Sequence, residues 1–252
     1  MFKHILCPVD FSEPSALAMR YAAALARSQH ADVTELHVDH GPVAPEILKK
    51  AATLPADVIV MGTHGSGGFE HMVLGSVAEK VLRKATCPVF TVPPHAELGP
   101  DAPFSRLICA VDFSEWSLAA LEEACAIAGE SRGAVTAVHV IEWPWIGGLT
   151  SFEGIPSEQA RALCEYRRYQ EALAQSRLDT AVKDIGRDRC VIETKIANGK
   201  AYSEILCAAE RQRADLIVVG VHGRNPLDVF FFGSTTHQVV RRAQCPVLTL
   251  RH

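Results

Sequence analysis

The sequence contains an internal duplication, and this feature constrains the fold more than any other. Residues 4–13 (HILCPVDFSE) align with residues 106–115 (RLICAVDFSE) at an offset of 102. Further along, residues 56–65 align with residues 214–223 at an offset of 158, and this second register holds to the end of the chain. The first copy therefore lacks a block of 56 residues that corresponds to positions 142–197.

The complete second copy shows an alternation of two kinds of segment. Continuous apolar runs are typical of strands buried on both faces, and the 3.6-residue periodicity between them is typical of amphipathic helices. We predict strands at 107–111, 134–141, 190–196, 214–221 and 246–250, and helices at 117–130, 156–184, 201–212 and 234–242. This alternation predicts an α/β fold with a doubly wound, Rossmann-like parallel sheet of strand order 3-2-1-4-5.

The first copy is predicted to have the same fold without its second helix and third strand. A strand at 33–38 leads directly into a helix at 44–53. The third strand of such a sheet is an edge, so its loss leaves strands 2-1-4-5 contiguous. We therefore predict two tandem domains, a truncated one over 1–93 and a complete one over 104–252, joined by a proline-rich linker over 94–103.

Composition and charge narrow the classes of function. A net charge of −4 and a pI near 6.3 provide no basic surface for a nucleic acid, so we expect no such partner. The apolar run Ile5–Val9 is too short for a signal peptide or an anchor, so we expect a cytoplasmic protein without membrane contact. Most of the eight cysteines lie in apolar, strand-like runs, so we interpret them as reduced core residues.

Both copies carry the same glycine pattern after their fourth strand. It reads Gly62-x2-Gly65-x9-Gly75-Ser76 in the first copy and Gly220-x2-Gly223-x9-Gly233-Ser234 in the second. Glycines without a Cβ let the backbone approach a polyphosphate, and the Gly-Ser pair opens a helix whose free amides favour an anion. We expect Ser76 and Ser234 to cap these helices or to donate their hydroxyls to a phosphate.

The pattern resembles the Gly-x2-Gly-x9-Gly-Ser/Thr loop with which universal stress proteins of the UspA family bind ATP. Residues 8–12 (PVDFS) resemble the first strand of that family, and the Cys-Pro-Val sequences at 87–89 and 245–247 resemble its last strand. The resemblance implies a nucleotide-dependent stress-response or signalling module. It also implies that the last strands of the two halves pair across a dyad and make an internal pseudo-dimer, which leaves open a homodimer of whole chains.

The resemblance also implies a set of binding residues. In the family, the acid after strand 1 and the backbone of the residue ending strand 2 hold adenine and ribose, and the glycine loop holds ribose and phosphates. The ligand implied is ATP, with or without Mg²⁺, and we expect no redox cofactor, no catalytic residue and no metal site. The residues assigned to nucleotide binding are Pro8, Val9, Asp10, Val38, Gly62, His64, Gly65, Gly75, Ser76 and Val77 in the first copy, and Ala110, Val111, Asp112, Val140, Gly220, His222, Gly223, Arg224, Gly233, Ser234 and Thr235 in the second.

Structural alternatives remain open for several of these features. Asp10 and Asp112 could cap the following helices, and the glycine loops could be turns that bind no nucleotide. A metal site at His37 and His40 is disfavoured, because these residues would point to opposite faces of a strand. We expect the charged run 161–177 to be the solvated face of a long helix.

Three functions fit the sequence: a nucleotide sensor, a slow ATPase or nucleotidyl transferase, and an interaction scaffold that binds no nucleotide. No Walker loop, no dinucleotide fingerprint and no nucleophile elbow occurs. Hydrolysis is expected to be slow at most, because no general base or arginine clamp is evident beside the loops. The two tryptophans within residues 143–145 could form a lid over the site, a surface for a partner, or ordinary packing over the long helix.

Overall fold

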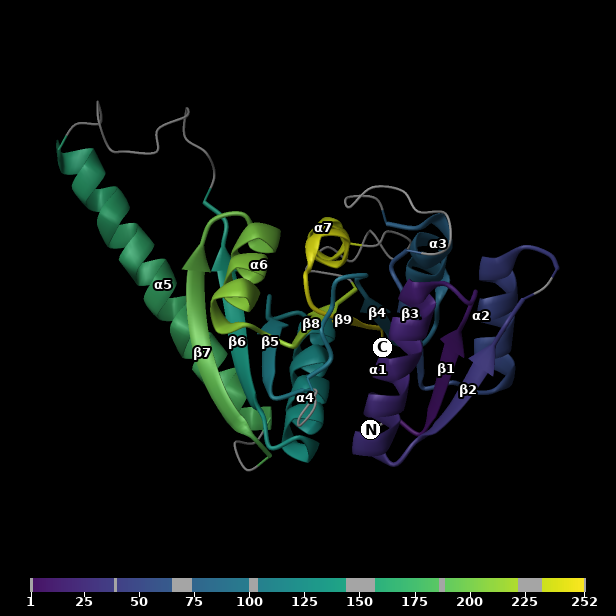
Figure 1. Ribbon diagram of the computed structural model, residues 1–252. Helices are drawn as coiled ribbons and strands as arrows, with labels where there is room; N and C mark the ends of the chain where they lie inside the picture. Colours follow the sequence, from purple (N-terminus) through teal and green to yellow (C-terminus); the bar gives the residue numbers. More distant parts are fainter. Residues whose placement is uncertain are drawn as a thin grey trace.

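One nine-stranded sheet runs through both halves of the chain (Figure 1). The computed structural model describes residues 2–38, 40–64, 74–99, 104–143, 157–185, 189–221 and 233–251. The strands of the first half are β1 (His4–Pro8), β2 (Asp32–Leu36), β3 (Val58–Gly62) and β4 (Val89–Val92). Those of the second half are β5 (Arg106–Ala110), β6 (Ala134–Ile141), β7 (Val191–Asn198), β8 (Leu216–Gly220) and β9 (Val247–Leu250).

The order of the strands is β2-β1-β3-β4-β9-β8-β5-β6-β7. When each strand takes the number of its counterpart in the complete domain, the order is 2-1-4-5 in the first half and 3-2-1-4-5 in the second, as the sequence predicts. The pairing of β4 with β9 is antiparallel and joins the halves, while all other neighbouring strands are parallel. The doubly wound fold of each half is thus confirmed, with β2 at one edge of the sheet and β7 at the other.

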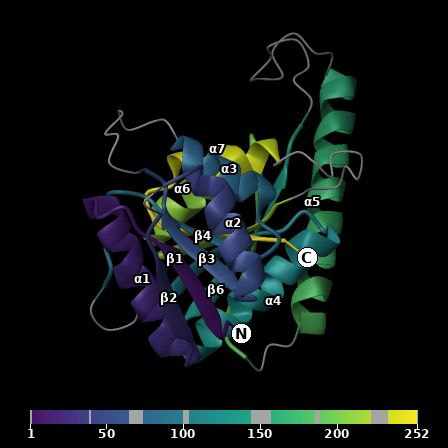
Figure 2. The same cartoon turned by 90° about the vertical axis from the view of Figure 1, so that its right-hand side faces the viewer.

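Helices cover both faces of this sheet (Figures 1 and 2). The helices of the first half are α1 (Glu13–Gln29), α2 (Val43–Thr53) and α3 (Ser76–Lys84), and those of the second half are α4 (Glu115–Glu130), α5 (Ser157–Ile185), α6 (Ala201–Gln212) and α7 (Ser234–Arg242). Buried residues of α1, α4 and α5 share one core cluster with one face of the sheet. Those of α2, α3, α6 and α7 share a second cluster with the other face.

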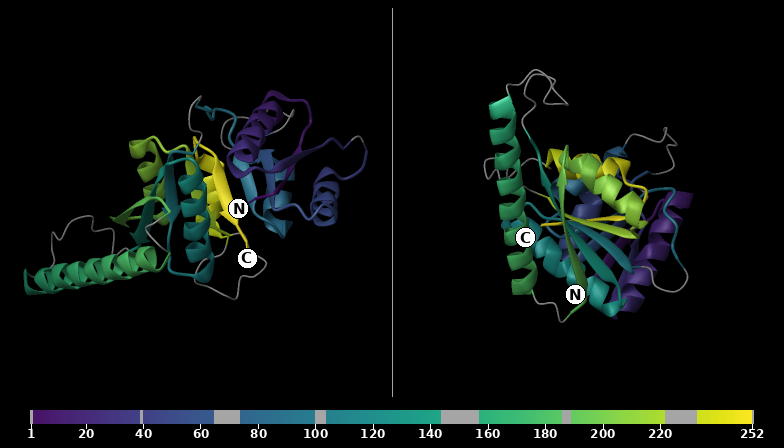
Figure 3. Two further views of the ribbon diagram at one scale, coloured as in Figure 1. Left: turned by 90° about the horizontal axis from the view of Figure 1, so that it is seen from below. Right: turned by 90° about the vertical axis from the view of Figure 1, so that its left-hand side faces the viewer.

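The local signals in the sequence explain how the helices begin. Ser12 caps α1 by accepting a hydrogen bond from the Ser15 amide, and Ser114 caps α4 in the same way from the Ser117 amide. Helix α5 belongs to the block that the first half lacks, and Figure 3 shows it projecting from the rest of the second half.

All eight cysteines fall within the described residues, and none of them forms a disulfide. Burial raises the pKa of the thiols of Cys7, Cys125 and Cys245 to about 12. Cys109 is fully buried and its pKa is raised for the same reason. These thiols therefore belong to the core and stay protonated at neutral pH.

Candidate nucleotide-binding cavity

The site begins at the turn that follows β5. Asp112 accepts a hydrogen bond through Oδ1 from the backbone amide of Ser114 at 3.0 Å, and a second from the Ser114 hydroxyl. Between them, Phe113 has a φ of 66°, in the left-handed region that a bulky side chain rarely adopts. The aspartate thus supports the residue that caps α4 and is not itself the cap, which corrects the capping alternative considered for Asp112.

A histidine and an arginine lie against the ring of Phe113. The Nδ1 of His139 donates to the backbone carbonyl of Val111 at 2.7 Å, which fixes the imidazole beside the turn. Its ring centroid is 4.5 Å from that of Phe113. From α5, the guanidinium carbon of Arg177 lies 4.2 Å from the centroid of the Phe113 ring, within range of a cation–π interaction. These contacts hold the strained turn in place.

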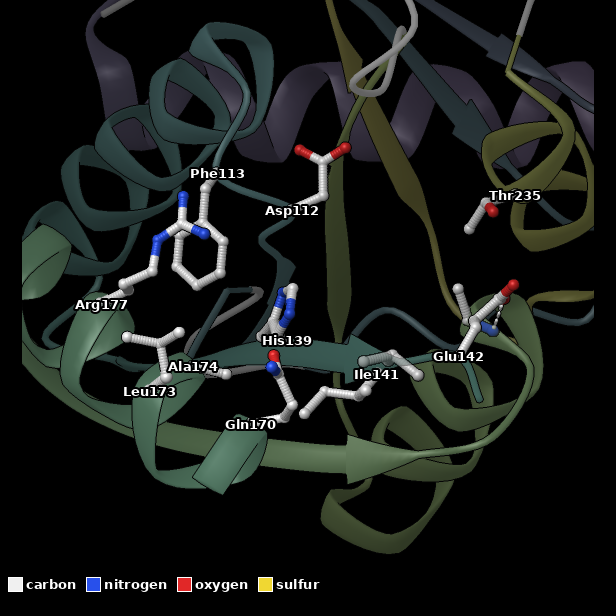
Figure 4. A pocket seen from close by; sticks show the side chains of 12 residues that line it. Asp112, Phe113, His139, Ile141, Glu142, Gln170, Leu173, Ala174, Arg177 and Thr235 are labelled. Atoms are coloured by element: carbon white, nitrogen blue, oxygen red, sulfur yellow. Dashed lines mark hydrogen bonds between the residues drawn. The ribbon is translucent and has the colours of Figure 1, made fainter. Parts of the chain in front are cut away.

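A cavity of about 470 Å³ opens next to this turn, at the carboxyl ends of β5 and β6 (Figure 4). This size lies within the range of small-molecule sites. Figure 4 shows Arg177 and Leu173 on one side of the cavity and Thr235 on the other, with Asp112 and His139 between them. The lining residues are Asp112, Phe113, His139, Val140, Ile141, Glu142, Gln170, Leu173, Ala174, Arg177, Ala201 and Thr235.

The segment that leaves β6 is tied to the neighbouring elements. Glu142 accepts a hydrogen bond through Oε1 from the backbone amide of Ala201, at the start of α6, at 2.6 Å. The indole of Trp143 donates to Asn198 Oδ1 at 2.8 Å and packs edge-on against Tyr166 of α5. Trp143, which follows β6, therefore contacts both β7 and α5, and these contacts favour the packing interpretation for this tryptophan. Pro144 and Trp145 lie outside the described residues.

The helix on the opposite side of the cavity begins at Ser234, as predicted, but its cap differs from the prediction. Gly233 is the N-cap and makes no side-chain bond, and Ser234 is the first helical residue. In the first half Gly75 and Ser76 take the same positions. The first alternative predicted for these serines, that they cap their helices, is therefore wrong, while donation of their hydroxyls to a phosphate stays a prediction.

The structure also gives these two glycines a packing role. The Gly233 amide donates to the carbonyl oxygen of Val221 at 3.0 Å, and a Cβ added to Gly233 would lie 2.9 Å from that same oxygen. In the first half, the Gly75 amide donates to the carbonyl oxygen of Thr63 at 2.8 Å, and a Cβ added to Gly75 would lie 3.0 Å from that oxygen. Close backbone approach thus favours glycine at both positions, independently of any ligand, and most strongly at Gly233.

The first half keeps the turn but not the wall of the cavity. Asp10 accepts from the Ser12 amide at 3.1 Å, Phe11 has a φ of 61°, and the ring centroids of Phe11 and His37 are 4.6 Å apart. The Nδ1 of His37 hydrogen-bonds to the carbonyl of Val9 at 3.0 Å. However, α5 and β7 have no counterpart here, and Phe11 is 76% exposed.

Three residues assigned from the sequence line the cavity: Asp112, Val140 and Thr235. Five others lie near the cavity without lining it: Ala110, Gly220 and Ser234 within β5, β8 and α7, Val111 directly after β5, and Gly233 directly before α7. Of the first-half residues, His64 bonds through Nδ1 to the Thr63 hydroxyl at 2.9 Å, and Gly62 packs closely, since an added Cβ would lie 3.0 Å from the His64 carbonyl oxygen. Pro8 ends β1, Val9 and Val38 follow β1 and β2, and Val77 lies in α3. Gly65, His222, Gly223 and Arg224 lie outside the described residues.

The lining residues that come from α5 were not predicted from the sequence. The run 161–177 was expected to be a solvated face, yet Arg177 lines the cavity and stacks on Phe113, which corrects that expectation. Phe113 and His139 could have been found from the repeat itself, because Phe11 and His37 occupy the matching positions at the offset of 102. Gln170, Leu173 and Ala174 left no such signal, because their block is present only once.

Comparison with known proteins identifies the family. The model of the universal stress protein family matches residues 1–40, 34–93 and 103–251, which together span most of the chain. The chain belongs to the universal stress protein family. As a tandem member it is interrupted in its first half, where two partial matches meet at the position of the absent block.

Individual universal stress proteins agree with this assignment. One from Methanocaldococcus jannaschii is 31% identical over 152 residues, which cover 59% of this chain and 82% of the relative. YxiE of Bacillus subtilis is 30% identical over 148 residues, 59% of this chain and 99% of the relative. The crystal structure of a universal stress protein from Archaeoglobus fulgidus has a TM-score of 0.65 at 21% identity and covers 99% of this chain and 96% of that one, which shows the shared fold.

Two features are absent from the residues that the structure describes. None of the described helices is both long and apolar enough to cross a bilayer. Within the same residues, no group of three or more histidine, cysteine, aspartate or glutamate side chains could hold a metal ion.

Proposed function

We propose that this universal stress protein binds an adenine nucleotide in the cavity of its second half and acts as a nucleotide-dependent signalling or stress-response module. The observation that carries the proposal is the position of the cavity. It lies at the carboxyl ends of β5 and β6, beside the point where the strand order reverses and where doubly wound sheets bind their ligands. Asp112, Val140 and Thr235, all implied by the family resemblance, line it together.

The chemistry of the two sides supports a particular orientation of the nucleotide. Thr235 lies in the first turn of α7, where unpaired amides and the positive end of the helix dipole favour phosphates. The opposite side is formed by Phe113, Leu173, Ala174 and Arg177, which are suited to contact a base through apolar and stacking surfaces. We therefore place the phosphates toward α7 and the base toward α5.

The same argument assigns one nucleotide to each chain. Four of the lining residues belong to α5, which the first half lacks. Without that wall, a base beside Phe11 would remain largely in water, because the Phe11 ring is itself exposed. The first half then serves as a partner for the second, and we propose that the antiparallel pairing of β4 with β9 makes the two halves an internal pseudo-dimer.

The proposal is tested by the nucleotide content of the protein and by its stabilisation. Purified protein is denatured, and the released nucleotides are quantified by chromatography; thermal melting is then measured with and without added ATP. We expect close to one adenine nucleotide per chain, and a melting temperature that rises with ATP, because a ligand that binds only the folded state must stabilise it. The absence of both signals would refute the proposal and favour a scaffold.

Matched variants locate the site. Asp112→Ala and Asp10→Ala remove the same turn-forming carboxylate from the two halves, so both lose the same hydrogen bond to a serine amide. We expect the nucleotide to be lost in Asp112→Ala and retained in Asp10→Ala. Loss in Asp10→Ala alone would place the site in the first half and contradict the argument from α5.

A further inference from the structure

The first half presents an aromatic side chain that the second half covers. The turns around Phe11 and Phe113 agree closely: φ is 61° and 66°, and the distances to the stacked histidine rings are 4.6 and 4.5 Å. A left-handed phenylalanine is strained, and such strain persists only where neighbouring groups hold it in place. The chain thus maintains the strained turn in both halves, although only one of them has α5.

The second half shows what kind of group lies on this ring. The Arg177 guanidinium occupies the face of Phe113 at 4.2 Å, and no equivalent arginine exists in the first half because α5 has no counterpart there. The ring of Phe11 is 76% exposed, more than any other large apolar side chain in the described residues. The corresponding position on Phe11 is therefore open to an arginine from elsewhere.

The residues around Phe11 differ from those around Phe113 in a way that favours a bound cation. Glu35 of β2 takes the place of Ala137 of β6, which is completely buried in the cluster that includes Leu178 and Val182 of α5. Cys7 pairs with Glu35, and Cys109 pairs with Ala137, so the two residues face the same side of the sheet. Asp10 and Glu13 are also exposed beside the turn. Asp10 and Glu13 match Asp112 and Glu115 of the second half at the offset of 102, so the difference between the halves is a buried alanine replaced by an exposed carboxylate, Glu35.

We propose that the surface formed by Phe11, His37, Glu35, Asp10 and Glu13, here called the Phe11 surface, binds an arginine-bearing segment of a partner protein. One guanidinium would stack on the Phe11 ring as Arg177 stacks on Phe113, and the carboxylates would attract the remaining positive charge. The acidic groups repel a polyanion or an anionic membrane, which makes a cationic segment the better occupant. This inference does not depend on nucleotide binding in the second half.

The test compares two peptides of equal charge on the full chain. Hexa-arginine and hexa-lysine are titrated at low ionic strength, with binding followed by calorimetry and by backbone amide chemical shifts. We expect hexa-arginine to bind more tightly, by up to about fivefold, the full worth of an exposed cation–π contact, because the planar guanidinium stacks on a ring and is less strongly hydrated than an ammonium. Shift changes should centre on residues 10–13 and 35–37. A surface that merely attracts positive charge would bind the two peptides equally.

Variants of the ring separate stacking from charge. Phe11→Leu keeps apolar bulk but removes the aromatic face, and Tyr169→Ala is the control, since it removes an aromatic side chain that is 64% exposed on α5. We expect Phe11→Leu to abolish the preference for arginine and Tyr169→Ala to preserve it, with unchanged melting temperatures reporting an intact fold. Glu35→Gln should weaken the binding of both peptides.

Four results would overturn the proposal, the first three from the peptide titrations. These three are equal affinity of the two peptides, a preference for arginine that survives Phe11→Leu, and shift changes confined to other surfaces. Self-association of the chain in sedimentation experiments that Phe11→Leu abolishes would also overturn it, because the occupant would then be a second copy of this protein.

Discussion

Replacement of Gly233 by alanine should destabilise the protein without any involvement of a ligand. The new Cβ would meet the carbonyl oxygen of Val221 at 2.9 Å, closer than real Cβ atoms approach another heavy atom. The neighbouring atom is backbone and accepts the Gly233 amide, so the chain can relieve the overlap only by lengthening or losing that hydrogen bond. The φ of Gly233 is −53°, which alanine adopts freely, so the effect arises from the contact and not from backbone strain.

The magnitude follows from the cost of overpacking. Forcing an extra carbon into a close-packed position costs about 1–3 kcal/mol, and loss of the amide hydrogen bond would bring the effect toward the upper end of that range. For a chain of this size, each kcal/mol lowers the melting temperature by about 2–4 °C. We therefore expect Gly233→Ala to melt about 2–12 °C below the parent protein, with ATP absent from both samples.

Two controls accompany this measurement by differential scanning calorimetry. Gly99→Ala should melt like the parent, because no atom lies within 4 Å of its added Cβ. Gly75→Ala should repeat the loss, because its Cβ would lie 3.0 Å from the Thr63 carbonyl oxygen. A Gly233→Ala protein that melts within 1 °C of the parent would refute the packing argument and leave ligand contact as the reason for the glycine.

Three further predictions concern the core. Asp215 accepts hydrogen bonds from Ser105 and Arg106, and burial raises its pKa above the ordinary value of 3.8. Because ionisation of this carboxyl opposes folding, the free energy of unfolding should decline as the pH rises through the range just above 3.8. Urea titrations of Asp215→Asn should lack that decline. Cys109 and Cys125, both fully buried and with pKa values raised by burial, should react with a thiol reagent at pH 8 only after unfolding, whereas rapid native labelling at these positions would contradict their burial. Leu178→Ala empties a fully buried site of α5 and should cost about 2–5 kcal/mol in chemical denaturation, an effect that a solvated α5 would not show.

Much of the fold could be predicted because the sequence contains two copies of the same pattern of strands and helices. Strand β6 and helices α6 and α7 were predicted to the residue, since apolar runs and amphipathic periods end there at clear turn residues. The absent α5 and β7 of the first half followed from the jump in register alone. The pairing of β4 with β9 was expected only through the resemblance, because no pattern within a strand says which partner it meets across an interface.

The site was less predictable, and the reason is geometric. The residues of β5, β6 and α7 carry motifs that repeat between the halves, so Asp112, Val140 and Thr235 could be assigned. Helix α5 forms one side of the cavity, but its charged composition predicts a solvent-exposed helix. Only its packing shows that Arg177 lies on the ring of Phe113. The glycine loops favoured phosphate contact in the sequence, whereas close backbone packing explains Gly75 and Gly233 without it.

The duplication and the deletion together account for the asymmetry of this protein. Both halves retain an aspartate, a strained phenylalanine and a stacked histidine in one geometry, so the local turn does not depend on α5. What α5 adds is a wall and a guanidinium, and these turn an exposed aromatic surface into one side of a cavity. Because β2 is an edge strand, loss of the block cost the first half little of its core while it exposed Phe11 beside acidic groups. One inherited turn therefore supports a small-molecule cavity where α5 is present, and a surface suited to a cationic partner where it is absent.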